Sequence, residues 1–250
     1  LYICSMSCRS VIYKGMFLAE TLTAFYPDLL DERFVSNFAI YHQRYSTNTF
    51  PTWHLAQPFR VIAHNGEINT LKGNVNWMKA HETRMATPVY GDFMADIKPI
   101  IQPGGSDSAM LDNVFEAMVG VGRTLPMVKC LLIPDVWAER ETMPKSHRDL
   151  YSYCNSVMEP WDGPAAICAF GGNWTVAGMD RNGLRPMRYT ITSDGLLIAG
   201  SETGMVRINE AEVVEKGRVG PGQMLAIDLG AGRLYRHHEI MDHLAGQADF

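Results

Sequence analysis

Four residues in this sequence could together hold an amino acid and polarise a carbonyl group in its side chain. Arg44 lies in YHQRYSTNTFPTW, where a strand-like pattern gives way to polar residues. Asn65 and Gly66 end the apolar run FRVIAHNG, and Asp107 stands in GGSDSAM. The fork of a guanidinium matches a carboxylate in two parallel hydrogen bonds, and a carboxylate pairs with an α-ammonium group. The four residues are therefore a candidate site for an amino acid.

Asn65 and Gly66 have two interpretations. Asn-Gly is the strongest short signal for a hairpin turn, but the next residues, NTLKGNVNWMKAHETRM, have helical spacing instead of the pattern of a partner strand. A glycine N–H can approach a carbonyl oxygen closely, and the asparagine amide adds a second donor. Such an oxyanion hole loses about 3–4 kcal/mol of transition-state stabilisation when one donor is removed. Alone, Asn-Gly favours a turn, Arg44 a salt bridge and Asp107 a helix cap; only their combination favours a site.

The elements that must position these residues follow from hydrophobic periodicity. Two short strands around a polar turn are predicted within 2–14, and further strands over 37–46 and 59–68. Helices are predicted over 16–25, 69–85 and 106–122, and over 124–160 with breaks at two prolines, and Ser106 or Asp107 is predicted to cap the third of these helices. From residue 164 onward, short apolar runs alternate with Gly, Asn and Asp turns. This order predicts an α+β fold with stacked sheets and outer helices, in one domain over 1–250.

The composition of the chain excludes some classes of function. The 250 residues are 46% hydrophobic, which suffices for a sizeable core. The net charge of −5 argues against nucleic acid and anionic membranes as partners, and we expect no membrane-spanning segment because every apolar run is shorter than about 20 residues. The five cysteines form no CxxC pair, so we expect reduced thiols, a cytoplasmic location and no zinc or iron–sulfur site.

Several longer runs of the sequence resemble one family. They are QRYSTNTFPTWHLAQPFRVIAHNGEINTLKGNVNWM (43–78), GGSDSAMLDNVFE (104–116), EPWDGPAAICAF (159–170) and DRNGLRPMRY (180–189). Together they resemble the glutamine amidotransferase domain of glutamate synthase, of the class II or N-terminal-nucleophile type, over essentially the whole chain. NTFPTW and NGEINTLKGN point to glutamate synthase among the class II enzymes.

The resemblance implies the four-layer αββα sandwich of N-terminal-nucleophile hydrolases. It also implies that Arg44 binds the α-carboxylate of L-glutamine and that Asp107 binds its α-ammonium group. Asn65 and Gly66 would form the oxyanion hole, and the segment 46–53 would be a lid over bound glutamine.

In this family, a cysteine at the mature N-terminus attacks glutamine, and its own α-amino group is the base. This sequence opens with Leu1 and lacks the family's opening Cys-Gly pattern. We therefore expect a fragment, the larger C-terminal part of a type 2 amidotransferase domain, without the nucleophile segment and the downstream synthase domains. Such a fragment is expected to be inactive alone. Cys4 and Cys8 are interpreted as structural thiols.

The parent enzyme implied by the resemblance hydrolyses glutamine and passes the ammonia to 2-oxoglutarate for reductive glutamate synthesis. It carries FMN and an iron–sulfur cluster outside this segment, where no cofactor or metal is expected. NADPH, NADH and ferredoxin remain open as electron donors, with the acidic composition favouring a bacterial pyridine-nucleotide type. Expected partners are L-glutamine, the downstream synthase domains and a small reductase subunit. Two alternatives remain: another class II amidotransferase, such as an asparagine or phosphoribosylamine enzyme, and a non-catalytic glutamine-binding regulatory module.

Three further motifs receive structural interpretations. Trp77 and Met78 are predicted to pack in the core. DRNGLRP, 180–186, is predicted to be a tight turn between strands. HHEIMDH, 237–243, has histidines and acids at possible metal spacing, but we interpret it as a solvated C-terminal segment.

Overall fold

The structure is a computed structural model that describes residues 2–44, 49–138 and 140–250. Its α-helices are Leu22–Phe25 (α1), Leu71–Glu82 (α2), Asp107–Gly120 (α3), Leu125–Leu132 (α4), Lys145–Val157 (α5) and His237–Ala245 (α6). Its strands are Ile62–Gly66 (β1), Ala165–Gly171 (β2), Trp174–Met179 (β3), Arg188–Thr192 (β4), Leu197–Gly200 (β5), Val213–Arg218 (β6), Met224–Asp228 (β7) and Arg233–Tyr235 (β8). None of the helices in these ranges combines the length and hydropathy of a membrane span.

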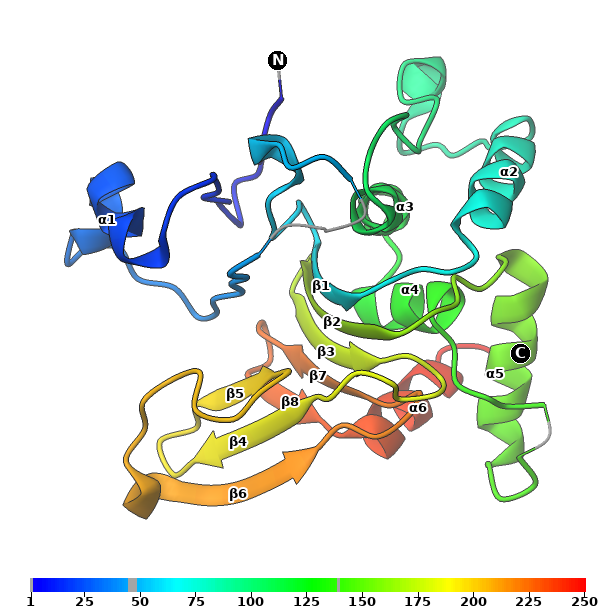
Figure 1. Cartoon of the computed structure of the whole chain (residues 1–250). Helices are drawn as coiled ribbons and strands as arrows, with labels where there is room; N and C mark the ends of the chain where they lie inside the picture. Colours follow the sequence, from blue (N-terminus) through cyan, green and yellow to red (C-terminus); the bar gives the residue numbers. More distant parts are fainter. Residues whose placement is uncertain (1, 45–48, 139) are drawn as a thin grey trace.

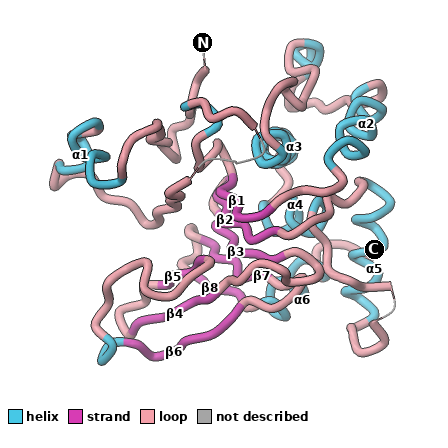
Figure 2. Tube along the Cα trace, viewed as in Figure 1, coloured by secondary structure: helices cyan, strands magenta, loops and turns pink. Residues whose placement is uncertain are grey.

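The strands form two antiparallel sheets, which are shown in Figures 1 and 2. The larger sheet has the order β1-β2-β3-β7-β8 and the smaller one has the order β5-β4-β6. β1 is an edge strand, and its last residue, Gly66, lies opposite Ala165 at the start of β2. The candidate site residues Asn65 and Gly66 therefore stand at one corner of the larger sheet.

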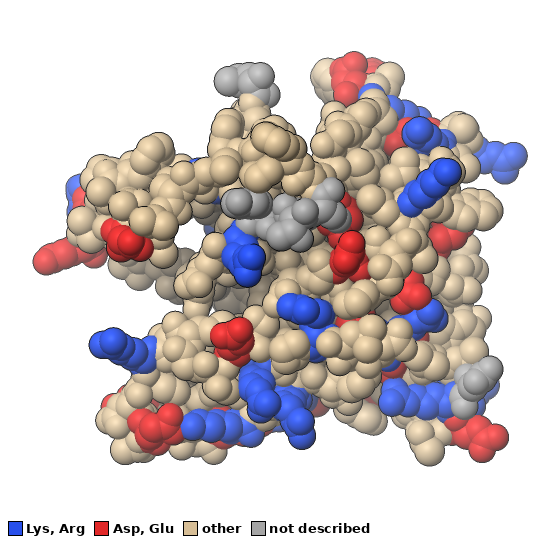
Figure 3. All heavy atoms as spheres, viewed as in Figure 1, with Lys and Arg blue, Asp and Glu red and all other residues tan. Residues whose placement is uncertain are grey.

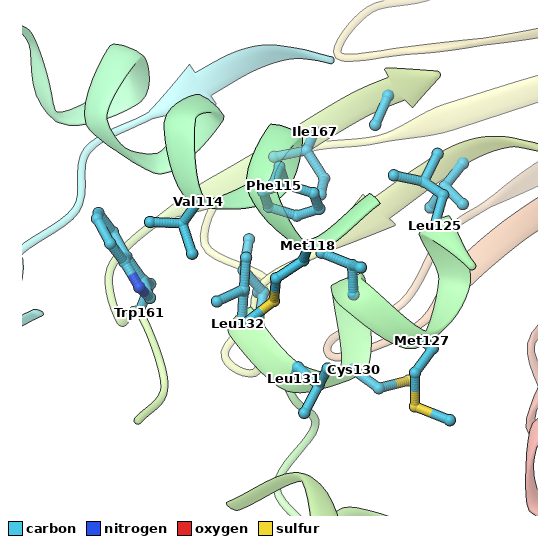
Figure 4. Close-up of a cluster of buried hydrophobic side chains, with 14 of the residues drawn as sticks. Val114, Phe115, Met118, Leu125, Met127, Cys130, Leu131, Leu132, Trp161 and Ile167 are labelled. Carbon is cyan, nitrogen blue, oxygen red and sulfur yellow. The ribbon is translucent and has the colours of Figure 1, made fainter. Parts of the chain in front are cut away.

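Helices cover one face of the larger sheet and form the main core with it. α3 packs on β1, α4 on β2 and β3, and α6 on β7 and β8, while α5 packs on α4 and α6. Figure 4 shows Phe115 of α3 beside Ile167 of β2, with Leu131 and Leu132 of α4 nearby. These four side chains are almost completely buried, and at about 25 cal/mol per Å² of apolar area such burial is the main stabilising contribution.

A second, smaller core lies between the two sheets. Ala166, Met179 and Leu225 of the larger sheet pack with Met187 and Val219, which border the smaller sheet. Successive layers are therefore helices, the larger sheet and the smaller sheet. The predicted α+β class with stacked sheets is confirmed, and the described elements form three of the four layers expected for the sandwich.

The predicted N-terminal strands are wrong for the described residues. Residues 2–14 and 37–44 form coil, whereas residues 45–46, the end of the strand predicted over 37–46, lie outside the described residues. An alternating pattern gives a strand only when a neighbouring strand pairs with its backbone. Here the chain instead rests against the sheet through side chains, and Phe38 stacks on Phe170 of β2 with ring centroids 4.1 Å apart.

Two other predictions need correction. Met78 is buried as expected, but Trp77 is 55% exposed, because α2 turns its Asn74–Met78 stripe inward and Trp77 falls outside it. The segment 237–243 is not a solvated tail. It lies in α6, whose Ile240, Met241 and Leu244 are buried, and the apolar residues between its histidines supply the helical stripe that packs on the sheet.

Candidate functional site

Two buried side chains replace the missing neighbour strand along the free edge of β1. Asp112 of α3 accepts the N–H groups of Val61 and Ile62 on Oδ1, at 2.8 and 2.9 Å. Gln57 binds both backbone groups of His64: its Oε1 accepts the His64 N–H at 2.6 Å, and its Nε2 donates to the His64 carbonyl at 3.0 Å. These contacts hold the edge strand straight up to the residue before Asn65.

The N–H of Gly66 faces this same free edge. The N–H of Glu67 donates to Pro164 at 2.8 Å, on the β2 side, and backbone polar groups alternate in direction along an antiparallel strand. The N–H groups of Ile62 and His64 point away from β2. The next N–H group along the strand with this direction is that of Gly66. A Cβ on Gly66 would lie 1.8 Å from the carbonyl oxygen of Pro164, so the backbone geometry here requires glycine.

Asp107 lies beside the end of β1. Ser106 caps α3 as predicted, because its Oγ accepts the Ala109 N–H at 3.1 Å. The following Asp107 accepts the N–H of Ile68 on Oδ2 at 2.8 Å, two residues after Gly66. Asp107 as a whole is 1% exposed. Asp107 therefore lies beside the backbone that follows Asn65 and Gly66.

A buried histidine connects this carboxylate to β1. His64 Nδ1 lies 2.7 Å from the Ser108 hydroxyl, which donates to Asp107 Oδ1 at 3.3 Å. A hydroxyl that donates to a carboxylate accepts from the ring, which assigns the proton of His64 to Nδ1. Burial lowers the pKa of His64, so the ring is neutral near pH 7. Its Nε2 is buried and lacks a hydrogen-bond partner in the described part of the chain.

The side chain of Asn65 points to the opposite face of the sheet from His64, since neighbouring residues of a strand alternate. There it meets the turn between β3 and β4, and Arg185 Nη2 donates to Asn65 Oδ1 at 2.6 Å. That turn is the predicted DRNGLRP turn: Gly183 donates to the Asp180 carbonyl at 3.1 Å and has φ +63°.

Arg44 lies two residues after His42, whose ring contacts its backbone. It is exposed in coil, and the described hydrogen bonds join its backbone to the ring of His42, with the Arg44 N–H donating to Nδ1 at 3.0 Å. It lines a cavity of about 1080 Å³ between the N-terminal segment and the sheet edge. Figure 3 shows the molecule hollowed between the N-terminal segment and the sheets. Ser46 and residues 47–48 of the predicted lid lie outside the described residues.

The cysteines do not make a metal or cluster site. Burial raises the pKa of Cys130 and of Cys168 to about 11, and it also raises the pKa of Cys154. Metal ligation needs the thiolate. Within the described ranges, His, Cys, Asp and Glu side chains form no group of three that could hold a metal ion, so these residues do not fit an iron–sulfur cluster.

Gln57, Asp112 and Arg185 were not among the predicted site residues. Gln57 lies between the predicted lid and β1, and Asp112 occupies an inward position of α3. Arg185 lies in DRNGLRP, which the sequence analysis interprets only as a turn. Asp112 could have been found from the sequence, because it stands between the apolar residues of AML and VFE in α3. A carboxylate that is buried there must accept hydrogen bonds.

Comparison with known proteins identifies the family of the chain. The chain matches the family of class-II glutamine amidotransferases over residues 1–250. It is 70% identical over 98% of its length to the glutamate synthase [NADPH] large chain of Azospirillum brasilense, of which it covers 16%. It is 48% identical over 91% of its length to the ferredoxin-dependent glutamate synthase of Antithamnion sp., of which it covers 15%.

A solved structure of glutamine phosphoribosylpyrophosphate amidotransferase from B. subtilis shares 21% identity and a TM-score of 0.42, over 78% of this chain and 34% of that one. The chain thus spans about a sixth of the length of the glutamate synthases that it matches. The family match covers every residue, and with it the corner of the larger sheet where Asn65, Gly66 and Asp107 meet. This chain belongs to the class-II glutamine amidotransferases.

Proposed function

We propose that this chain is part of the glutaminase domain of a glutamate synthase, binds L-glutamine and supports its hydrolysis to glutamate and ammonia. The observation that carries the proposal is the open end of β1. The Gly66 N–H continues the outward row of donors there, with the Asn65 amide adjacent and Asp107 bonded to the backbone two residues on.

The proposed chemistry follows from the charges at this corner. Asp107 holds the α-ammonium group of glutamine and Arg44 holds its α-carboxylate. The side-chain carbonyl of glutamine then lies against the Gly66 N–H and the Asn65 Nδ2. When a thiolate attacks the carbonyl carbon, the oxygen becomes negative, and the two donors stabilise it in the transition state. The base that took the proton of the thiol returns it to the amide nitrogen, so that the C–N bond breaks and ammonia leaves; water then cleaves the thioester and releases glutamate.

We assign the attack to a cysteine in another part of the full-length protein. Three of the five cysteines here are held as thiols by burial, which raises their pKa. Cys4 and Cys8 lie in the N-terminal coil, outside the helices and strands, and we interpret both as structural thiols. The 250-residue segment alone should therefore leave glutamine intact.

The remaining steps belong to the full-length protein. We propose that the released ammonia passes to downstream synthase domains, where 2-oxoglutarate is converted to glutamate with FMN and an iron–sulfur cluster. The electron donor is NADPH, NADH or ferredoxin, and a small reductase subunit is the proposed partner with a pyridine-nucleotide donor. A cytoplasmic location fits the five free cysteines.

The test compares kcat and KM for glutamine in the full-length protein. Asn65→Ala and Asn65→Asp each remove the Nδ2 donor, and we expect kcat to fall by about 10²–10³-fold. Arg44→Ala should instead raise KM, because the α-carboxylate is bound in the ground state and the transition state alike.

The control is Asn209→Ala, because Asn209 is an exposed asparagine beside β6. Unchanged kcat in both Asn65 variants would refute the oxyanion hole, and a glutamine complex without turnover in the native protein would favour a binding module.

A further inference from the structure

We propose that Arg185 is a positioning residue for this reaction: it fixes the orientation of the Asn65 amide so that Nδ2, and not Oδ1, is presented to the substrate. The proposal rests on the proposed function of Asn65. It starts from the 2.6 Å hydrogen bond between Arg185 Nη2 and Asn65 Oδ1, which joins residues 120 positions apart in the sequence.

The chemistry of the two groups makes this contact directional. An asparagine amide has one accepting and one donating end of nearly the same shape, and rotation about its last bond exchanges them. An oxyanion hole needs the donating end. A guanidinium has five N–H donors and no acceptor, so it pairs with Oδ1 alone. Arg185 therefore disfavours the flipped amide, in which two donors would face each other and a carbonyl oxygen would face the developing oxyanion.

The turn that carries Arg185 is fastened to the same corner of the sheet. Asp180, which is 2% exposed, accepts the N–H groups of Asn182 and Gly183 on Oδ1, at 2.9 and 2.8 Å. Its Oδ2 accepts the N–H of Ala165 at 2.8 Å, and Ala165 is the residue opposite Gly66. The turn is thus joined by hydrogen bonds to the strand pair that carries Asn65 and Gly66, which keeps the guanidinium within reach of Asn65.

The charge of Arg185 acts in the same direction. The guanidinium lies near enough to His64 to lower the pKa of that ring, as one of its smaller causes. A fixed positive charge beside the hole favours the negative oxygen of the transition state over the neutral carbonyl of glutamine. Both effects of Arg185 are therefore greater in the transition state than in the ground state.

The experiment is a double-mutant cycle in the full-length protein, with kcat and KM for glutamine as separate readouts. Arg185→Met keeps an unbranched apolar stem and removes the donors and the charge of the guanidinium. We expect kcat to fall by about 10–100-fold while KM changes less than about threefold, because only the transition-state contact is lost. In an Asn65→Ala background, Arg185→Met should cause a clearly smaller loss, because the amide that it orients is absent and only the effect of its charge remains. Arg185→Lys retains a donor and a charge and should recover much of kcat. Arg188→Met, an exposed arginine on β4, is the matched control.

The outcomes separate the two hypotheses. If Asn65→Ala lowers kcat and Arg185→Met does not, the role of Arg185 is wrong and the proposed function stands. An equal loss from Arg185→Met in both backgrounds also overturns it, because Arg185 would then act independently of Asn65. A rise in KM alone would assign Arg185 to glutamine binding instead. If Asn65→Ala has no effect, the proposed function itself fails. Should Arg185→Met lower the unfolding temperature, the same cycle is read with Arg185→Ala and Arg185→Lys.

Discussion

Gln57 binds His64 as a neighbouring strand would, with one side-chain amide pairing both backbone groups of a residue seven positions away. Gln57 is 6% exposed, so both hydrogen bonds are shielded from water. The contact ends the supported part of the β1 edge two residues before Gly66. It leaves the Gly66 N–H as the next outward donor, in a backbone whose direction Gln57 has set.

Replacing Gln57 with methionine should loosen β1. Methionine fills a similar volume but leaves the N–H and carbonyl of His64 buried without partners, at about 1–3 kcal/mol for each group. We expect the free energy of local opening to fall by about 2–6 kcal/mol and kcat for glutamine to fall with it. Hydrogen exchange followed by mass spectrometry on peptides containing 59–68 measures the opening.

The matched control for this variant is Gln102→Met. Gln102 is exposed, and its Nε2 donates to the Pro99 carbonyl at 2.8 Å in a loop, where water can replace the lost bond. Exchange in 59–68 should be unchanged in the control. If Gln57→Met also leaves it unchanged, the edge of β1 is supported by Asp112 without help from Gln57.

Two Gly→Ala substitutions should act in opposite directions. In Gly66→Ala the new Cβ would lie 1.8 Å from the Pro164 carbonyl oxygen, so β1 and β2 must separate, and glutaminase activity should be lost. In Gly73→Ala the Cβ meets nothing within 4 Å. Gly73 lies inside α2, where alanine stabilises a helix by about 0.5–1 kcal/mol relative to glycine.

Activity assays and thermal unfolding of the full-length variants test this pair. Gly73→Ala should keep wild-type kcat with an equal or higher unfolding temperature. A Gly66→Ala enzyme with wild-type kcat would show that the close approach of Pro164 is not needed, and with it that the Gly66 N–H is not held where the proposed chemistry requires it.

His237 should make the packing of α6 sensitive to acid. Burial is the largest cause that lowers its pKa, to about 3, well below the ordinary 6.5. As pH falls below 6.5, His237 is protonated in the unfolded chain but stays neutral in the folded chain. The free energy of unfolding therefore decreases between about pH 6.5 and 3. His237→Gln removes this titration, and the midpoint of acid unfolding, followed by circular dichroism, should move to lower pH.

His243→Gln is the comparison, because His243 is an exposed histidine on the same helix. It should leave the acid midpoint close to that of the wild type. Equal midpoints for wild type and His237→Gln would show that the packing of α6 does not lower the pKa of His237.

Much of the site could be predicted because its signals are local. FRVIAHNG has the apolar run of a buried strand and ends in Asn65-Gly66, and GGSDSAM has a cap residue before a helical stripe, so β1 and the start of α3 lie where the pattern places them. The N-terminal strands could not be predicted in the same way. Their alternation fits a strand, but pairing depends on whether another strand lies alongside, and in the described residues none does so.

The sequence by itself determined the residue types of the candidate site, since the chemistry of Arg44, Asn65, Gly66 and Asp107 is contained in their side chains and short surroundings. The tertiary structure alone decided how they are held. Gln57 on the edge of β1 and Arg185 on Asn65 are contacts of polar side chains, one of them across 120 residues. Hydrophobic periodicity does not report such contacts, because a hydrogen bond needs two partners in a fixed geometry, and only the folded chain brings both into reach.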